Sequence, residues 1–141
     1  MIMRDFLVKI ARNGKGIFTR KTFPVNERVF EIKGNRVTRY EDEVIDEIIC
    51  VNAIRFSMQY YLSPEGEVAN YLNHSCEPNT KIMKKKKLYL VAISNIAKDI
   101  ELVFDYSTIT AQDDNWTTDC NCGIYDCRRV VQKFSKLPVK L

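Results

Sequence analysis

Short segments in which apolar and polar residues alternate run along much of the chain, and each predicts a β-strand. Residues 5–10 predict a first strand and residues 17–23 a second one. Asn13-Gly14-Lys15-Gly16 between them predicts a flexible turn, and Pro24-Val25-Asn26 a further turn. The N-terminal quarter of the chain is therefore expected to form short strands joined by tight turns.

The segment from residue 28 to residue 40 predicts a hairpin. Residues 28–32 and 36–40 are strand-like, and they flank the turn-forming sequence Lys33-Gly34-Asn35. Residues 54–62 are rich in aromatic and β-branched side chains and predict one strand, and further strands are expected at 88–93 and 101–106.

Helical patterns are rare in this sequence. Residues 40–50 place apolar side chains at helical spacing and predict the main helix, and residues 67–72 predict a single helical turn. Strands do not alternate with long helices, so a doubly wound α/β fold is excluded. The pattern favours a small domain made mainly of short strands.

Length and composition fit one folded domain inside a cell. The chain has 141 residues, of which 45% are hydrophobic, so it can bury a core without disulfides. No apolar run is long enough to cross a bilayer, and residues 1–9 are too short and polar for a signal peptide. We therefore expect a soluble protein in a reducing compartment, without membrane contact.

The charge is mildly basic. There are 22 basic and 18 acidic residues, giving a net charge of +4, which permits but does not require attraction to nucleic acid. Lys84 to Lys87 form a run between two strand-like segments and are interpreted as a solvated hairpin tip, with a nucleic-acid or nucleosome contact as the alternative. The basic residues are scattered along the sequence, so a zinc-dependent nucleic-acid binder is the weaker hypothesis.

The cysteines point to a metal site. Five is an odd number, so complete pairing in disulfides is impossible. Three of the five lie within eight residues: Cys120, Cys122 and Cys127. Zinc prefers four tetrahedral nitrogen or sulfur ligands, so one ligand must come from elsewhere. The candidates are two other cysteines and the single histidine: Cys76, Cys50 and His74. Cys50 follows the apolar face of the expected helix and is interpreted as a buried thiol.

Four segments in a fixed order resemble one known family. Asn73-His74-Ser75-Cys76-Glu77-Pro78-Asn79 resembles the NHSCxPN signature of SET-domain methyltransferases. Residues 14–18 look like the GxG segment of that family, residues 101–106 match its ELxxDY motif, and residues 120–128 match its post-SET CxCxxxxC segment. The resemblance extends from about Gly14 to Cys127. It departs from the pattern after Cys127, where Arg128-Arg129 replaces the common Arg-Gly.

The resemblance implies a fold and a division of the chain. The fold is mainly β: a SET-domain, β-clip-like arrangement of small curved sheets with few short helices. It has a knot-like core, formed where residues 73–79 pass under the loop that carries residues 101–106. Residues 1–112 would form the SET domain, and residues 113–141 a post-SET zinc-binding tail.

The resemblance also implies an activity, which is methyl transfer from S-adenosylmethionine to a lysine side chain of a protein, most often a histone tail. Tyr106 matches the catalytic residue, whose hydroxyl aligns the amine with the methyl group. Cofactor contacts are implied for seven residues: Gly14, Lys15, Gly16, Asn73, His74, Tyr106 and Trp116. Among these, His74 is expected to act through its backbone, not as a general base. The alternative for Trp116 is a core or surface role.

Three aromatic residues would line the substrate channel: Phe104, Tyr61 and Tyr60. A phenylalanine at position 104 leaves room for additional methyl groups, which implies di- or trimethylation, unless Phe104 is simply core packing. Alternation along a strand points one of the two tyrosines inward, and we favour Tyr61.

The resemblance implies that the structural zinc is held by four cysteines: Cys76, Cys120, Cys122 and Cys127. The metal would order the tail over the active site, so chelation is expected to reduce both activity and stability. A eukaryotic source would imply the nucleus or chromatin, and any other source the cytoplasm, with a monomer or homodimer in either case. The competing hypothesis is a non-catalytic SET-like module that binds a peptide.

Overall fold

The computed structural model describes residues 2–38, 53–57, 60–109 and 117–132, and these residues form small β-sheets. Twelve strands and two single 3₁₀ turns follow in this order: β1 (Phe6–Ala11), β2 (Gly14–Thr19), β3 (Arg28–Ile32), β4 (Asn35–Thr38), β5 (Ile54–Arg55), β6 (Tyr60–Ser63), η1 (Val68–Tyr71), β7 (Asn73–His74), β8 (Thr80–Lys85), β9 (Lys87–Ala92), β10 (Glu101–Phe104), η2 (Tyr106–Ile109), β11 (Thr118–Asp119) and β12 (Val130–Val131). The expected mainly β fold is confirmed. Within these ranges, no helix has the length and apolar character that a membrane crossing requires.

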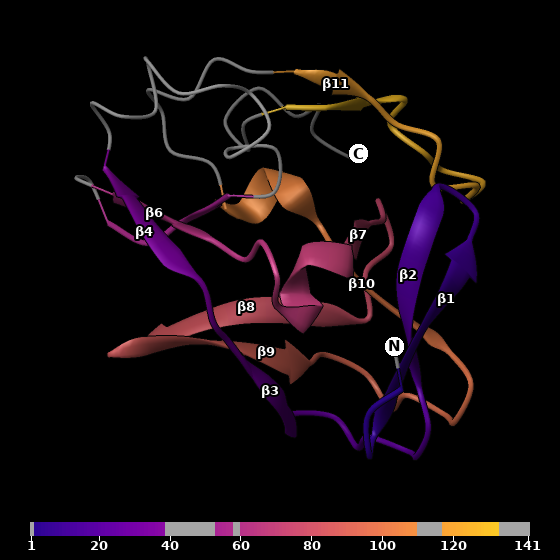
Figure 1. Ribbon diagram of the computed structural model, residues 1–141. Helices are drawn as coiled ribbons and strands as arrows, with labels where there is room; N and C mark the ends of the chain where they lie inside the picture. The colour runs from indigo at the N-terminus through magenta and orange to yellow at the C-terminus, as the bar shows by residue number, and fades with distance from the viewer. Residues whose placement is uncertain (1, 39–52, 58–59, 110–116, 133–141) are drawn as a thin grey trace.

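The first sheet has the strand order β1-β2-β10-β7 (Figure 1). β1 and β2 form a hairpin in which Phe6 pairs with Thr19 and Ala11 with Gly14. The expected strand at 5–10 is thus confirmed, but the turn is shorter than expected, because Gly14 to Gly16 belong to β2. The second strand also ends earlier, at Thr19 instead of residue 23.

Two segments that lie about thirty residues apart in sequence pair in parallel within this sheet. Val103 of β10 pairs with Asn73 of β7, and Phe104 with His74. Since β10 carries the ELxxDY sequence and β7 the start of NHSC, the pairing places the two motifs side by side. The functional site is built at this junction.

The hairpin expected at residues 28–40 is wrong. β3 pairs with β9, and β4 pairs with β6, so the two strands belong to different three-stranded sheets, β3-β9-β8 and β4-β6-β5. The reason lies at Gly34, where a Cβ atom would stand 2.1 Å from the carbonyl oxygen of Ser63. The glycine permits this close backbone approach as the chain passes from one sheet to the next, instead of turning back on itself.

The single strand expected at residues 54–62 is in fact two. β5 and β6 are antiparallel, and the backbone N–H groups of Phe56 and Ser57 both donate to the carbonyl oxygen of Tyr60. The turn expected at residues 67–72 is confirmed as η1, whereas the helix expected at residues 40–50 lies outside the described residues.

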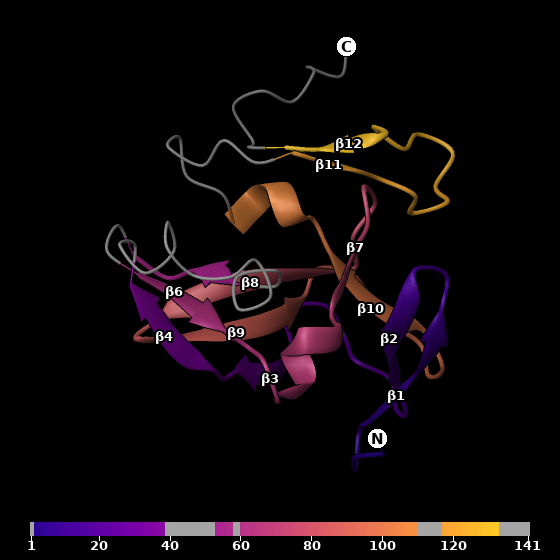
Figure 2. The ribbon, with the colours of Figure 1, turned by 45° about the horizontal axis from the view of Figure 1, so that its top comes forward.

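The core lies between the sheets. Ile17, Leu90 and Leu102 come from three different strands and are completely buried. Burial of such side chains contributes about 1.5–3 kcal/mol each. Strands β11 and β12 pair only with each other and lie beyond β7 and η2, at the side of the molecule opposite β3 and β9 (Figure 2). The tail is therefore a separate layer placed over the motif-bearing strands.

Candidate active site and metal cluster

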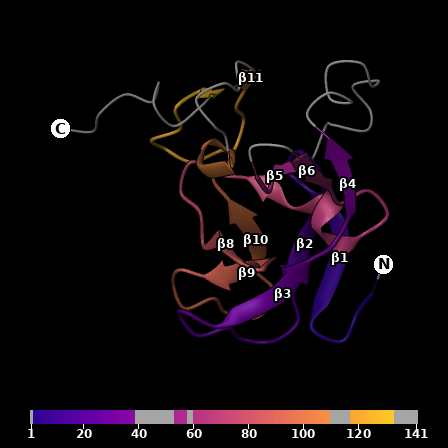
Figure 3. The same cartoon turned by 90° about the vertical axis from the view of Figure 1, so that its left-hand side faces the viewer.

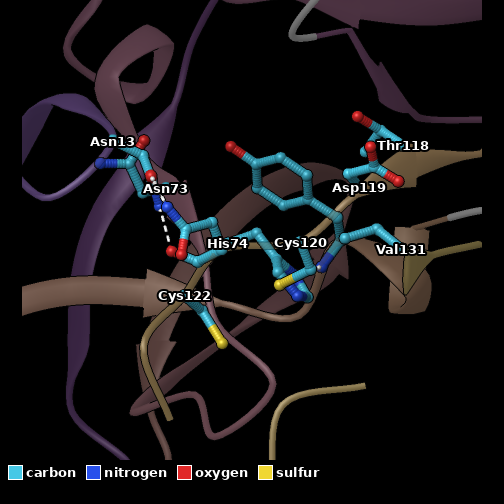
Figure 4. Close-up of a pocket in the computed structure, with 10 residues that line it drawn as sticks. Asn13, Asn73, His74, Thr118, Asp119, Cys120, Cys122 and Val131 are labelled. Carbon is cyan, nitrogen blue, oxygen red and sulfur yellow. Dashed lines mark hydrogen bonds between the residues drawn. The ribbon is translucent and has the colours of Figure 1, made fainter. Parts of the chain in front are cut away.

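A cavity of about 320 Å³ lies between the two motif segments and the tail. Three of its lining residues come from the motifs: Asn73, His74 and Tyr106. The others come from the β1–β2 turn and from the tail: Asn13, Thr118, Asp119, Cys120, Asn121, Cys122 and Val131. Figure 4 places Asn13 and Asn73 at one end of the group and Thr118 and Val131 at the other. The tail thus forms one wall of the site.

Asn73 is fixed by two hydrogen bonds from its side-chain amide. Nδ2 donates to the carbonyl oxygen of Lys15 at 2.9 Å and to Oε1 of Glu101 at 2.8 Å. Both N–H groups are therefore engaged, which leaves Oδ1 as the acceptor that this side chain offers to a ligand. The same bonds tie β7 to β2 and β10.

His74 is held as a neutral imidazole. Burial lowers its pKa; the negative charge of Asp105 raises it only in part, and the positive charge of Arg128 lowers it further. Its Nδ1 accepts the backbone N–H of Tyr106 at 3.0 Å, so the ring proton sits on Nε2, which is 3.5 Å from Sγ of Cys76. The ring therefore positions its neighbours, and both of its nitrogens are occupied.

Tyr106 is partly buried, with its hydroxyl group tied to the backbone. The hydroxyl donates to the carbonyl oxygen of Leu72 at 2.6 Å. Burial, with a smaller contribution from the charge of Glu101, raises the pKa of Tyr106 to about 12. The phenol is accordingly neutral at physiological pH, and its oxygen retains lone pairs that can accept hydrogen bonds.

Asp105, next to Tyr106, forms a two-fold ion pair with the tail. Nη1 and Nη2 of Arg128 lie 2.8 and 2.7 Å from the two carboxylate oxygens, and Oδ1 also accepts the backbone N–H of Ser107. Burial acts to raise the pKa of Asp105, but the hydrogen bonds from Arg128 and Ser107 and the charges of Arg128 and His74 outweigh it, so the pKa lies below its ordinary value. This pair fastens the tail to the segment that carries Tyr106.

A second attachment joins the tail to the β1–β2 turn. Asn13 donates from Nδ2 to the carbonyl oxygen of Asn121 at 2.7 Å, and Arg12 donates to the same oxygen at 3.0 Å and to Oδ1 of Asn121 at 3.1 Å. The neighbouring Gly123 has a φ of +80°, in the left-handed region that favours glycine, and a Cβ there would push the guanidinium group of Arg12 aside. The turn therefore closes one end of the cavity.

Four cysteines from distant parts of the chain meet beside the cavity. The sulfur atoms of Cys76, Cys120, Cys122 and Cys127 all lie within 4.8 Å of one another, and those of Cys76 and Cys120 are 3.7 Å apart. A zinc ion with four sulfur ligands at about 2.3 Å places neighbouring sulfurs about 3.8 Å apart. The four residues implied as zinc ligands are therefore together, in a geometry that fits one tetrahedral metal ion.

The surroundings favour a thiolate at Cys122, whereas burial raises the pKa of Cys76 and of Cys120. Backbone N–H groups of Arg128 and Arg129 point at Sγ of Cys76 and Cys127, each at 3.4 Å. Burial opposes ionisation of Cys122, but hydrogen bonds from backbone groups and neighbouring thiols lower its pKa to about 6. The thiolate of Cys122 is thus available at neutral pH to bind a cation. The bound cation would then favour loss of the proton from the other three thiols.

The contact expected between Gly14, Lys15 and Gly16 and a cofactor remains a prediction. Gly14, Lys15 and Gly16 do not line the cavity; the carbonyl oxygen of Lys15 instead holds Asn73. Gly14 is required by its φ of +94°, in the left-handed region, whereas a Cβ at Gly16 would lie 2.3 Å from Oε1 of Glu101. Gly16 therefore makes room for Glu101.

Replacing Gly16 with alanine should displace Glu101 and release Asn73. Overpacking of this kind costs about 1–3 kcal/mol, and we expect a lower melting temperature together with weaker cofactor binding. Thermal unfolding and calorimetric titration with S-adenosylmethionine measure the two effects. Gly14→Ala is the matched control. The new Cβ would meet nothing within 4 Å, so this variant introduces backbone strain without a steric clash. Equal loss of cofactor binding in both variants would contradict the role given to Gly16.

The residues expected in the substrate channel do not border this cavity. Phe104 is buried in the core, with its ring 4.8 Å from that of Tyr106. Tyr60 stacks on Phe56, and Tyr61 accepts a hydrogen bond from Arg55. Their role in a channel remains a prediction. Trp116 lies outside the described residues.

Sequence reasoning missed several residues of the site. Three of them hold other parts in place: Arg12, Glu101 and Asp105. Five more line the cavity from the turn or the tail: Asn13, Thr118, Asp119, Asn121 and Val131. Asp105 could have been found, since it lies within the ELxxDY motif and Arg128 was noted as the start of a departure. The contact between Arg12 and Asn121, 109 positions apart, has no local signal.

Comparison with known proteins agrees with this site. The family model described as SET domain matches residues 14–107. A similar protein is "Histone-lysine N-methyltransferase ASHH3" of Arabidopsis thaliana, which is 27% identical over 87% of this chain and 37% of its own length. Another is "Histone-lysine N-methyltransferase, H3 lysine-4 specific" of Saccharomyces cerevisiae, 25% identical over 80% of this chain and 12% of its own length. A third is the human "Histone-lysine N-methyltransferase, H3 lysine-36 specific", 29% identical over 67% of this chain and 4% of its own length.

The chain therefore spans less than two fifths of each of these relatives. The family match covers the segment that contains both motifs of the cavity and the pairing of β7 with β10. On the motifs, the sheets and this match together, the chain belongs to the SET domain family.

Proposed function

We propose that this chain is a protein-lysine N-methyltransferase that uses S-adenosylmethionine as methyl donor and a histone as substrate. The observation that carries the proposal is the meeting of Asn73, His74 and Tyr106, from two separate motifs, in one cavity. The names of the three relatives support lysine methylation and a histone target. Because histones are found in chromatin, we also propose that the chain acts in the nucleus.

The cavity suits a cofactor that has an amino-acid end and a nucleoside end. Its volume of about 320 Å³ lies in the range of small-molecule sites. We assign the ammonium group to Oδ1 of Asn73 and the ribose hydroxyls to the carboxylate of Asp119. The backbone of His74 would border the rest of the cofactor, and so would residues 14–16 at the start of β2, where the carbonyl oxygen of Lys15 holds Asn73.

When bound, S-adenosylmethionine would supply an electrophilic methyl group on a sulfonium ion, for transfer to the amine nitrogen of the lysine with the thioether as leaving group. Tyr106 is assigned the positioning of that amine. Its O–H donates to Leu72, so the oxygen lone pairs can accept an N–H of the substrate and fix the direction of approach. The ring is partly buried and borders the cavity, so the oxygen can be reached from the site.

Tyr106 does not serve as a base in this proposal. With its pKa raised to about 12, the phenol holds its proton throughout the working range of pH. His74 is equally unsuited, because Tyr106 N–H and Cys76 occupy both ring nitrogens. The substrate lysine therefore loses its proton to solvent before transfer, and the rate should rise with pH as the amine fraction grows.

The test is methyl transfer from radiolabelled S-adenosylmethionine to core histones and to a mixed protein lysate. The wild-type chain should label a histone band, and Tyr106→Phe should lower the rate about a hundredfold while the cofactor still binds. Equal labelling by the wild-type chain and by Tyr106→Phe would show that the hydroxyl of Tyr106 is not needed for methyl transfer. Cofactor binding without label in any protein would support the non-catalytic peptide-binding module instead.

The degree of methylation should depend on Phe104. We propose di- or trimethylation, since the phenylalanine adds no hydroxyl group that would hold the amine and restrict it. Phe104→Tyr should shift the products toward monomethyl-lysine, as measured by mass spectrometry of the labelled histone at equal turnover. An unchanged product ratio would assign Phe104 to core packing alone, in keeping with its burial.

The division of labour in the chain follows from the same proposal. We assign catalysis to residues 1–112 and zinc binding to residues 113–141, with Cys76 as the link between them. Support comes from the end of the family match at residue 107 and from strands β11 and β12, which pair only with each other. A bound zinc ion would hold the tail wall of the cavity in place.

A further inference from the structure

The sheet β3-β9-β8 gathers basic residues that are scattered in the sequence. Lys81 pairs with Val91 and Lys85 with Lys87 across β8 and β9, while Arg28 of β3 also pairs with Val91. Residues paired across antiparallel strands point to the same face of a sheet. The opposite face carries Leu88 and Leu90, which are buried in the core.

We call the outer face of this sheet the basic face and define it by five residues: Arg28, Lys81, Lys85, Lys86 and Lys87. All five are exposed, and Lys86 forms the turn between β8 and β9. Lys81 and Lys85 are four residues apart on one strand, which is about 13 Å. That span exceeds the Debye length at physiological salt, about 8 Å, so the two lysines act on a ligand mainly through direct contacts, which an extended polyanion can make with both.

Opposing charge on the basic face is small. Glu31 is the acidic residue within the three strands, and it lies 3.3 Å from Lys87. Lys81, Lys85 and Lys86 have no acidic partner within the described residues. A net charge of about four positive units therefore remains for a partner.

The tip of the β8–β9 hairpin is fixed in place. Lys84 donates to the carbonyl oxygen of Phe56 and lies 4.5 Å above its ring. Phe56 stacks on Tyr60 at 4.9 Å, and Arg36 covers the far side of Tyr60 at 4.4 Å. This stack of two rings between two cations anchors the hairpin to the neighbouring sheet, so the lysines at its tip project from a fixed base.

The aromatic residue on the basic face is not available for stacking on a base. The guanidinium carbon of Arg28 sits 3.7 Å from the centre of the Tyr89 ring. Lysine ammonium groups are point charges that recognise phosphate without reading bases. The basic face is therefore built for contact with a charged backbone, without sequence preference.

We propose that the basic face binds the phosphodiester backbone of a nucleic acid. It lies at the end of the molecule away from the tail strand β11, as Figure 1 and Figure 3 both show. The cavity between β7 and the tail thus stays open while the nucleic acid is bound. The proposal is independent of methyl transfer, because binding can be measured without cofactor or histone.

The experiment is fluorescence anisotropy of the full zinc-loaded chain with a labelled 20-base-pair DNA duplex of mixed sequence, at several salt concentrations. With about four phosphates neutralised, affinity should fall about a hundredfold between 50 and 200 mM salt. Lys85→Gln/Lys86→Gln should bind about tenfold more weakly at 50 mM and lower the slope against log salt by about two. A duplex RNA of the same sequence tells DNA from RNA as the source of the phosphates.

The matched control is Lys9→Gln/Lys98→Gln, which removes the same charge from β1 and from the β9–β10 connection. It should leave the slope nearly unchanged. Equal losses in the two double variants would overturn the proposal, because net charge alone would explain binding. Displacement of the duplex by polyglutamate at equal charge concentration would overturn it too, in favour of an acidic protein surface, as would an absence of binding at 50 mM salt.

Discussion

Stripping zinc from the chain is expected to abolish methyl transfer and to undock residues 117–132, while the rest of the fold persists. Zinc bound to four cysteines contributes about 10–16 kcal/mol of apparent free energy at neutral pH, far more than any other single contact of the tail. The core side chains Ile17, Leu90 and Leu102 lie outside the tail and keep their packing. Because tail residues 118–122 and 131 form a wall of the cavity, cofactor affinity should be lost with the metal.

Hydrogen exchange separates the two parts of this prediction. After treatment with a chelator, amides of β11 and β12 should exchange at the rate of an unfolded peptide, whereas those of β8 and β9 should remain protected. Cys120→Ser should behave likewise without chelator. Zinc should restore protection and activity, and magnesium, which prefers oxygen ligands, should not. Full activity in the zinc-free chain would show that the active site does not depend on the metal.

The residues that carry chemistry were predictable from the sequence to the extent that short motifs contain them. The four cysteines, Asn73 and Tyr106 are fixed by local spacing within their motifs, and the structure brings the cysteines together at one point and Asn73 and Tyr106 into one cavity. Zinc chemistry limits the choice of ligand, so the spacing of Cys120, Cys122 and Cys127 predicts a metal site without knowledge of the fold, whereas Cys76 as the fourth ligand was implied only by the family resemblance. The roles of Asn73 and Tyr106 remain proposals.

Strand pairing was predictable only where the partners are neighbours in sequence. The β1–β2 and β8–β9 hairpins have local signals, whereas β3 pairs with β9, about sixty residues away. A turn sequence such as Lys33-Gly34-Asn35 favours a hairpin locally, and the backbone contact between Gly34 and Ser63 overrides it. The basic face was predictable only in part: the lysine run 84–87 is visible in the sequence, with a nucleic-acid contact as the alternative to a solvated hairpin tip, but only the register of β3, β8 and β9 adds Arg28 and Lys81 to it.

Replacement of Arg128, which attaches the tail to Asp105, is expected to lower both stability and activity. Arg128→Met removes the guanidinium group and leaves the carboxylate of Asp105 buried next to a neutral His74. Side chains of the pair are 15% and 11% exposed, so solvent cannot take the place of the lost partner. Breaking a buried pair on one side costs about 3–5 kcal/mol, and we expect the melting temperature to fall accordingly.

Catalysis should fall together with stability in this variant, because Asp105 directly precedes Tyr106, whose backbone N–H is held by His74. A positioning role predicts a lower kcat with zinc still bound, measured by metal content of the purified protein. Arg129→Met is the matched control: Arg129 is exposed, and the change removes the same charge one residue away.

Asp105→Asn combined with Arg128→Met separates the ion pair from the packing of the arginine stem. Asparagine keeps an acceptor for the N–H of Ser107 but carries no charge, so the double variant should be more stable than Arg128→Met alone. If the double variant were as unstable as the sum of the two single variants, the arginine would act through its packing. If Arg128→Met were no worse than Arg129→Met, the metal alone would hold the tail, and the carboxylate beside the catalytic tyrosine would need another explanation.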